Sequence, residues 1–175
     1  MIEQASRKLA TYIKEADPEG PSSVEVMAWV IGLALNFFLA LVLTAVAGLS
    51  TDNLGQTLFA FFSFCLIRFL SGGHHLNSLT WCSIVTALLI FPIPLIDLSK
   101  TIVLILSVIS VLMFLYFAPF RKQDTNLSHE MSQRMKFLAV LLILSNLYFL
   151  NPILALVFFF QSTLLVHKKE VIKVE

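Results

Sequence analysis

The chain has 175 residues, of which 58% are apolar and 13% are charged, and its formal net charge is +1. Soluble domains are about 45–50% apolar, so this composition excludes an ordinary soluble protein and indicates an integral membrane protein. The small net charge gives no sign of nucleic-acid binding, and no nucleic-acid partner is expected. Because the apolar residues run continuously instead of alternating, we predict an all-α transmembrane helical bundle that forms a single membrane domain over residues 1–175.

Residues 1–20 predict an amphipathic helix followed by a linker. Six apolar side chains recur at helical spacing in the first sixteen residues: Ile2, Ala5, Leu9, Tyr12, Ile13 and Ala16. This pattern predicts a helix that lies on the membrane surface. The segment DPEGPSS ends that helix, and Ser22 or Ser23 is expected to cap the next one.

Six membrane spans are predicted between residues 26 and 166. They are Val26–Leu49, Leu54–Leu70, Leu79–Leu98, Thr101–Phe120 and two short helices from the tract Phe137–Val166, divided at Asn151-Pro152. A proline disfavours helix at the residue before it, which supports the division. Because the last two helices are short for a crossing of roughly 30 Å, four spans plus a re-entrant or interfacial hairpin is the alternative.

The basic residues predict the orientation of these spans. With six crossings and the amino terminus inside, eleven of the twelve Lys and Arg residues fall on the cytoplasmic side, and only Lys100 falls outside. Cytoplasmic loops carry an excess of Lys and Arg. We therefore expect a multi-pass protein of the plasma membrane with both termini and the loop before Cys82 on the cytoplasmic side.

The stretch RFLSGGHHLNSLTWC, residues 68–82, concentrates reactive side chains between two apolar runs. His75 and Cys82 would lie about 10 Å apart on one unbroken helix, too far for a hydrogen bond. Gly72 and Gly73 are expected to act as a hinge that ends the first helix, and Asn77 or Ser78 is expected to cap the next. A flexible turn would let His75 fold back toward Cys82.

With Ser78 as the cap, Cys82 becomes the fourth residue of a helix, near the positive end of the helix dipole. A thiolate is favoured there, which predicts a nucleophile with an imidazole base. The simpler alternatives are a packing cysteine, an interfacial histidine and a glycine pair that only permits a turn. A metal site would need further ligands such as His74 or His129, so no metal and no cofactor is expected. Cys65, inside an apolar run, is predicted to be inert packing.

These residues carry a resemblance to a known family. Arg68, Gly72-Gly73, His75 and Cys82 resemble the signature of the accessory gene regulator protein B family, the membrane cysteine endopeptidases of bacterial quorum sensing. The hydropathy profile is similar as well, and so is YFAPFRKQDTN, an Ala-Pro followed by a polar loop. The resemblance implies a bacterial cell membrane protein that processes a peptide pheromone.

It further implies that Cys82 is the nucleophile and His75 its base. The implied partner is a propeptide like that of the accessory gene regulator system, with an amphipathic leader, a central cysteine and an acidic tail. Cleavage would release the tail and permit cyclisation to a thiolactone, or to a lactone where serine replaces the cysteine. Membrane lipid and a second copy of the chain, as a homodimer, are the other expected partners.

Three further basic residues have alternative roles. Arg68 is predicted either to stabilise an oxyanion or hold a substrate carboxylate, or to snorkel to the interface. Arg121 and Lys122 are predicted either to bind the acidic tail or to serve only as topology signals.

A transporter or exporter of a peptide or metal is the competing function, and a non-catalytic scaffold is the third. A transporter predicts polar residues in several spans, but Asn36, Asn146 and Gln161 are few and dispersed. They are expected to form hydrogen bonds between helices.

Overall fold

The computed structural model describes residues 1–72, 78–118 and 129–166, and its regular elements are helices. In chain order they are α1 (Ile2–Ala16), α2 (Val24–Ser50), α3 (Leu54–Ser71), α4 (Leu79–Ile90), the 3₁₀ helix η1 (Ile93–Leu95), α5 (Lys100–Phe117), α6 (His129–Phe149) and α7 (Pro152–Val166). The prediction of an all-α protein is confirmed over these residues.

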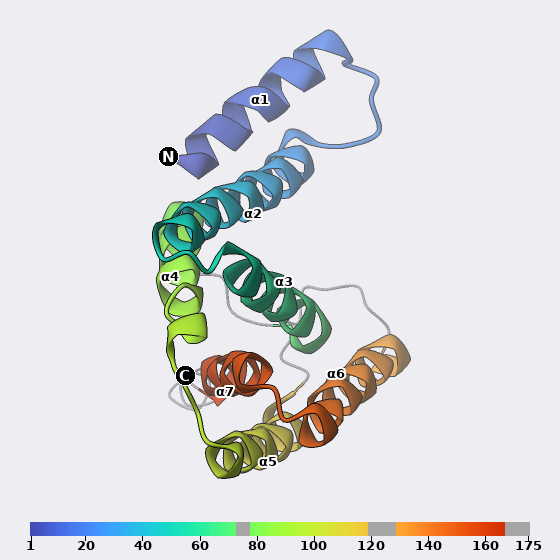
Figure 1. Cartoon of the computed structure of the whole chain (residues 1–175). Helices are drawn as coiled ribbons and strands as arrows, with labels where there is room; N and C mark the ends of the chain where they lie inside the picture. Colours follow the sequence, from blue (N-terminus) through green and yellow to red (C-terminus); the bar gives the residue numbers. More distant parts are fainter. Residues whose placement is uncertain (73–77, 119–128, 167–175) are drawn as a thin grey trace.

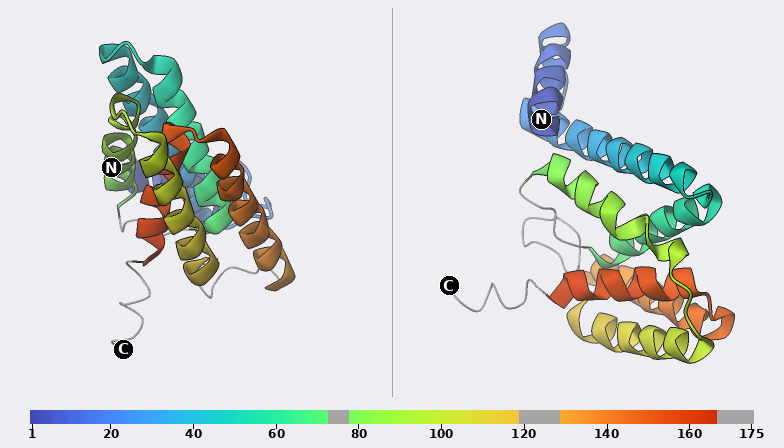
Figure 2. Two further views of the ribbon diagram at one scale, coloured as in Figure 1. Left: turned by 60° about the horizontal axis from the view of Figure 1, so that its bottom comes forward. Right: turned by 60° about the vertical axis from the view of Figure 1, so that its left-hand side comes forward.

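Helices α2 to α7 run back and forth, so the bundle has two ends (Figure 1). One end, called here the α1 end, carries α1, the first turns of α2, α4 and α6, and the last turns of α3, α5 and α7. The opposite end carries the connections from α2 to α3, from α4 to α5 and from α6 to α7. The right-hand view of Figure 2 shows this alternation, and shows that α1 points in a different direction from the other helices.

Helix α3 packs between two groups of helices. One group is α1, α2 and α4, and the other is α5, α6 and α7, while α3 contacts members of both. The largest buried side chains of this contact region are Phe61, Phe64, Ile67, Phe114, Ile143 and Phe158. The last turn of α3, which carries Arg68, is therefore held between the two groups.

The turn between α6 and α7 follows the predicted break at Asn151-Pro152. Asn151 Oδ1 accepts hydrogen bonds from the backbone N–H groups of Ile153 (2.9 Å) and Leu154 (3.2 Å), so its side chain caps α7. Pro152 is the first helical residue, where a missing N–H is harmless. The predicted start of the helix before this turn was wrong, because α6 begins at His129 instead of Phe137.

The predicted span Leu79–Leu98 is not a single helix. α4 ends at Ile90, and η1 with extended backbone at Ile96 follows. Pro92 and Pro94 are the physical reason, because proline lacks the N–H that an α-helix requires and its ring clashes with the preceding turn.

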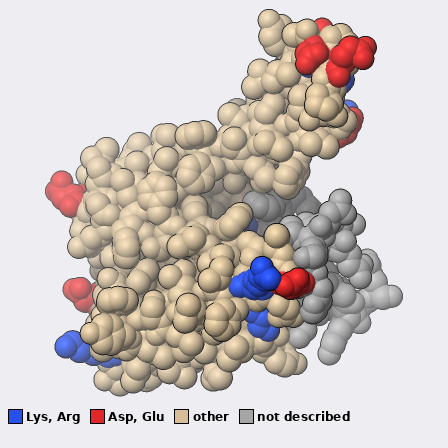
Figure 3. Space-filling model, turned by 90° about the vertical axis from the view of Figure 1, so that its right-hand side faces the viewer, with Lys and Arg blue, Asp and Glu red and all other residues tan. Residues whose placement is uncertain are grey.

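Within the described ranges, three helices are long and apolar enough to cross a membrane, namely α2, α3 and α5, and shorter apolar helices cover Leu79–Leu95 and Pro152–Leu165. In Figure 3, most charged side chains lie toward the two sides of the view, with a broad band of uncharged atoms between them. A wide apolar band bordered by charges is typical of a protein embedded in a bilayer.

Helix α1 packs against α2 through small side chains. Ser6 and Ala10 are buried, and a Cβ added at Gly32 of α2 would lie 3.4 Å from Ser6 Oγ and 2.9 Å from a methyl of Leu79. Apart from Ile2, which is buried, the predicted apolar stripe is not the face that packs on the protein. Its members Leu9, Tyr12 and Ile13 stay exposed, as a helix on a membrane surface requires.

Candidate functional site

Cys82 lies in the first turn of α4. Ser78 caps this helix, because its Oγ accepts a hydrogen bond from Trp81 N at 3.5 Å, and the N–H of Cys82 donates to Ser78 O at 3.0 Å. Cys82 is thus the fourth helical residue, as predicted. Its side chain is buried, with 5% of the residue exposed.

The start of α1 lies against the same turn. Glu3 Oε1 accepts a hydrogen bond from Leu79 N, and Ile2 N donates to Thr80 Oγ1 at 3.3 Å. Hydrogen bonds from its own backbone N–H and from that of Leu79 lower the pKa of the Glu3 carboxyl from 4.5 to about 2. This contact could not be predicted from the sequence, because the two residues are separated by 76 positions and no motif links them.

A second contact holds α4 against α2. Ser83 is fully buried, and its Oγ lies 2.7 Å from Asn36 Oδ1 and 3.1 Å from Asn36 O on α2. The prediction that Asn36 bonds between helices is confirmed. Because Ser83 follows Cys82 directly, this bond orients the helix turn that carries the thiol.

The chain leaves α3 at Gly72, whose backbone has φ 73° and ψ −170°. This region of backbone space is accessible in practice only to glycine. The expected end of the helix at Gly72 is confirmed.

A cavity of about 310 Å³ opens between α2, α3 and α4, and Cys82 lines it. Arg68 and Gly72 line the same cavity, so the structure brings three of the predicted site residues together. The guanidinium of Arg68 lies 5.7 Å from the centre of the Phe64 ring. The other lining residues are Leu33, Asn36, Phe37, Ala40, Phe61, Phe64, Cys65, Phe69 and Thr86.

Most of the cavity wall is apolar, with polar groups at a few points. Such a pocket is the usual form of a site that holds an organic ligand and fixes it with a small number of polar contacts. Cys65 is half-buried and packs against the core, as predicted, but it also lines this cavity.

Several predicted site residues lie outside the described part of the chain. They are Gly73, His74, His75, Arg121 and Lys122; for His129 only the backbone is described. Within the described ranges, no group of three or more His, Cys, Asp or Glu residues could hold a metal ion.

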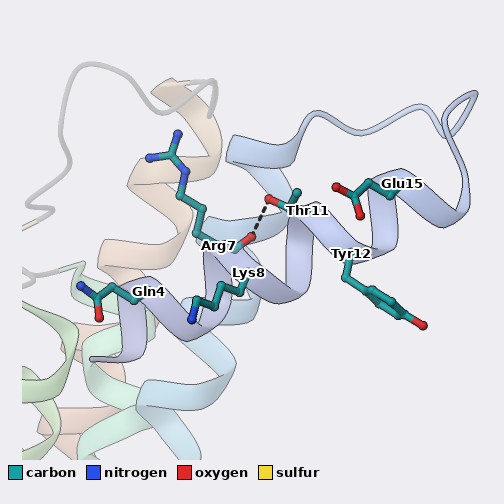
Figure 4. Close-up of a pocket in the computed structure, with 6 residues that line it drawn as sticks. All are labelled: Gln4, Arg7, Lys8, Thr11, Tyr12 and Glu15. Atoms are coloured by element: carbon teal, nitrogen blue, oxygen red, sulfur yellow. Dashed lines mark hydrogen bonds between the residues drawn. The ribbon is translucent and has the colours of Figure 1, made fainter.

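A second concavity lies on the outer face of α1. Figure 4 shows that its six lining residues all come from this one helix, with Thr11 Oγ1 donating to Arg7 O at 3.0 Å. It contains no thiol and no wall from a second element. The cavity at Cys82 is therefore the candidate site.

These features define an all-helical membrane protein with a buried thiol that lines a largely apolar cavity at one end of its bundle. The chain belongs to the accessory gene regulator B family, whose family model matches residues 6–172. It is 27% identical over 145 residues to an AgrB-like protein of Halalkalibacterium halodurans, a match that covers 82% of this chain and 74% of that protein. No solved structure matches the chain.

Membership in the family confirms the resemblance drawn from residues 68–82. The chain is thus a membrane protein of accessory gene regulator quorum sensing, in a family associated with propeptide processing and with a propeptide partner.

Proposed function

We propose that this protein is a membrane cysteine endopeptidase that removes the acidic tail of an autoinducing propeptide and permits its cyclisation. The observation that carries the proposal is the position of Cys82, buried in the first turn of α4 on a cavity shared with Arg68 and Gly72. A thiol that lines a cavity is placed to attack the carbonyl carbon of a bound peptide, which is the first step of nucleophilic catalysis by cysteine.

In the proposed reaction, Cys82 Sγ attacks the carbonyl carbon that joins the signal sequence to the tail. His75 takes the thiol proton and later gives a proton to the leaving amine, so the amide bond is replaced by an acyl-enzyme thioester. The propeptide's own cysteine then attacks this thioester, which closes a thiolactone ring and returns Cys82 as the thiol. With serine in that place, the product is a lactone.

The cavity supports cyclisation over hydrolysis. Replacing an amide by a thioester is uphill, so the intermediate must be kept from water and the released tail must be removed. The cavity walls are mostly apolar and Cys82 is nearly inaccessible, which favours transfer to a second thiol over attack by water.

Basic residues are assigned supporting roles in this proposal. Arg68 shares the cavity with Cys82, where a guanidinium can stabilise the oxyanion that forms during attack or hold a substrate carboxylate. Arg121 and Lys122 are proposed to bind the acidic tail.

We also propose that α2 to α7 all cross the membrane, with the α1 end in the cytoplasm. The alternating directions of these helices support this topology (Figure 2). Among the described basic residues, Arg7, Lys8 and Lys14 lie on α1, whereas Lys100 begins α5 at the opposite end. This distribution agrees with a cytoplasmic excess of positive charge.

Replacing single residues tests the proposed chemistry. Cys82→Ala should reduce propeptide cleavage in membranes by at least about 1,000-fold, since loss of a nucleophile removes the covalent route. His75→Ala should reduce it by at least about 100-fold. Both variants should insert into the membrane at the wild-type level. Cys65→Ala, which removes the other thiol of the chain, should stay active; cleavage by Cys82→Ala would refute the proposal.

A further inference from the structure

The side chain of Gln161 makes a long-range contact at the point where the chain leaves α3. Gln161 lies on α7 and is fully buried. Its Nε2 donates hydrogen bonds to Ser71 Oγ and to Gly72 O, each at 3.0 Å. These partners precede Gln161 by 90 and 89 positions, so one amide joins α7 to the end of α3.

The groups that Gln161 holds are themselves fixed. Ser71 is fully buried, and its Oγ donates to Ile67 O at 2.8 Å within α3. Gly72 has the backbone geometry reserved for glycine, and α3 ends at the residue before it. The contact therefore holds Gly72 O in place at the end of α3.

Among the described residues, the hydrogen bonds of the Gln161 side chain all come from its nitrogen. Gln161 Oε1 is buried and has no hydrogen-bond partner among the described residues. A buried acceptor without a partner destabilises the fold, so an apolar side chain would suit a purely packing role better. The presence of an amide at position 161 is explained if its N–H groups are needed to hold Gly72 in place.

The position that Gln161 fixes belongs to the candidate site. Gly72 lines the cavity of Cys82, and the sequence reaches His75 three residues later. A restraint on Gly72 O is thus a restraint on both the cavity wall and the starting point of the segment that carries the proposed base.

We propose that Gln161 is a positioning residue for the reaction at Cys82, acting through Gly72. This inference rests on the proposed function, since it assigns Gln161 to the pairing of His75 with Cys82. Gln161 touches neither the thiol nor the substrate in this proposal. Its role is to hold Gly72 in place in the wall of the Cys82 cavity.

The same fold contains a matched control for a merely structural amide. Asn146 on α6 is also fully buried, and its Nδ2 donates to Ser107 Oγ on α5 at 3.1 Å and to Asn151 O at 3.2 Å. Its Oδ1 accepts a hydrogen bond from Asn151 N at 3.0 Å, so its loss also tests the effect of a weakened turn before α7. The pair of Asn146 and Ser107 is likewise an amide and a buried serine on different helices, but neither residue lines the cavity of Cys82. Gln161→Met and Asn146→Leu remove the two amides with little change in volume.

The test measures how fast iodoacetamide alkylates Cys82 in the full-length chain in detergent micelles, with mass spectrometry to separate Cys82 from Cys65. The ratio of the rates at pH 7 and pH 9.5 is the readout. A nearby imidazole promotes thiolate formation at pH 7, whereas at pH 9.5 the thiol ionises without help. A change in access alone moves both rates and leaves the ratio constant.

We expect Gln161→Met to lower this ratio at least threefold, toward the value of His75→Ala, and Asn146→Leu to leave it within 1.5-fold. In a chain that already carries His75→Ala, Gln161→Met should not lower the ratio of alkylation rates any further. Should Gln161→Met fail to fold, Ser71→Ala compared with Ser107→Ala gives the same comparison, with a smaller fall expected only for Ser71→Ala.

The role of Gln161 and the proposed function are refuted by different results. If His75→Ala lowers the ratio but Gln161→Met and Ser71→Ala match their controls, the role of Gln161 is refuted and the proposed function stands. If His75→Ala itself leaves the ratio unchanged, the pairing of His75 with Cys82 is refuted, and the role of Gln161 falls with it.

Discussion

The carboxylate of Glu3 accepts a hydrogen bond from the backbone N–H of Leu79, the first residue of α4. This contact joins the start of the surface helix α1 to the turn that carries Cys82, three positions further along. The free N–H groups at a helix start attract a negative charge, which explains the match between an acidic side chain and this site.

Glu3→Gln should weaken this contact in a pH-dependent way. The pKa of Glu3 is lowered from 4.5 to about 2, so its stabilising contribution is present above pH 4.5 and is lost as the pH falls toward 2. At pH 7 the substitution should reduce the free energy of unfolding by about 0.5 kcal/mol, measured by thermal unfolding in detergent micelles. At pH 2.5 the difference should be smaller than at pH 7, and it should vanish only below pH 2. Glu15→Gln, exposed at the far end of α1, is the control; an equal loss there would argue against a specific role for Glu3.

Gly72→Ala should destabilise the protein and impair the site. A side chain in the backbone geometry of Gly72 is strained by about 1–3 kcal/mol, so we expect a lower melting temperature. Gly55→Ala is the matched change, because Gly55 is helical and a Cβ there meets no atom within 4 Å. Alanine favours helix over glycine, so Gly55→Ala should leave the melting temperature equal or raise it. A harmless Gly72→Ala would contradict the observed geometry.

Ser83→Ala should loosen α4 from α2. The substitution removes a hydrogen bond between helices and leaves Asn36 Oδ1 without the hydroxyl donor, at a cost of about 1 kcal/mol. Ser110→Ala provides the comparison, since Ser110 is equally buried but bonds within its own helix, to Leu106 O. Unfolding in detergent micelles should show the larger loss for Ser83→Ala. Equal losses would mean that the bond to Asn36 contributes nothing.

The proposed orientation can be read from cysteine labelling in intact cells. In a chain lacking both native cysteines, Ser50→Cys at the end of α2 should react with a membrane-impermeant maleimide added outside. Lys8→Cys on α1 should react only after lysis, because the α1 end is proposed to be cytoplasmic. Both positions are exposed in the structure, so access within the protein does not limit either reaction. The reverse pattern would overturn the topology.

Local signals in the sequence predicted the helix boundaries next to the site. The cap at Ser78, the end of α3 at Gly72 and the break at Asn151-Pro152 depend on neighbouring residues only, and all three are confirmed. Hydropathy alone was a poorer guide: it merged α4 and η1 into one span although Pro92 lies between them and Pro94 lies within η1.

Contacts between distant segments could not be predicted in the same way. Asn36, Asn146 and Gln161 were expected to bond between helices, but the identity of each partner depends on how the helices pack. The contact between Glu3 and Leu79 could not be predicted either, because helical periodicity describes one helix and does not identify the helix that packs against it.

The helix that bears Cys82 is short, and this has a consequence for the surrounding lipid. Its twelve residues rise about 18 Å, against roughly 30 Å of hydrocarbon in a typical bilayer. In the proposed topology this hydrophobic mismatch is relieved by thinning the bilayer beside α4. Headgroups and the aqueous phase then come closer to Cys82 than a full-length span would allow, so the rate of the proposed propeptide cleavage is expected to depend on the acyl-chain length of the lipid.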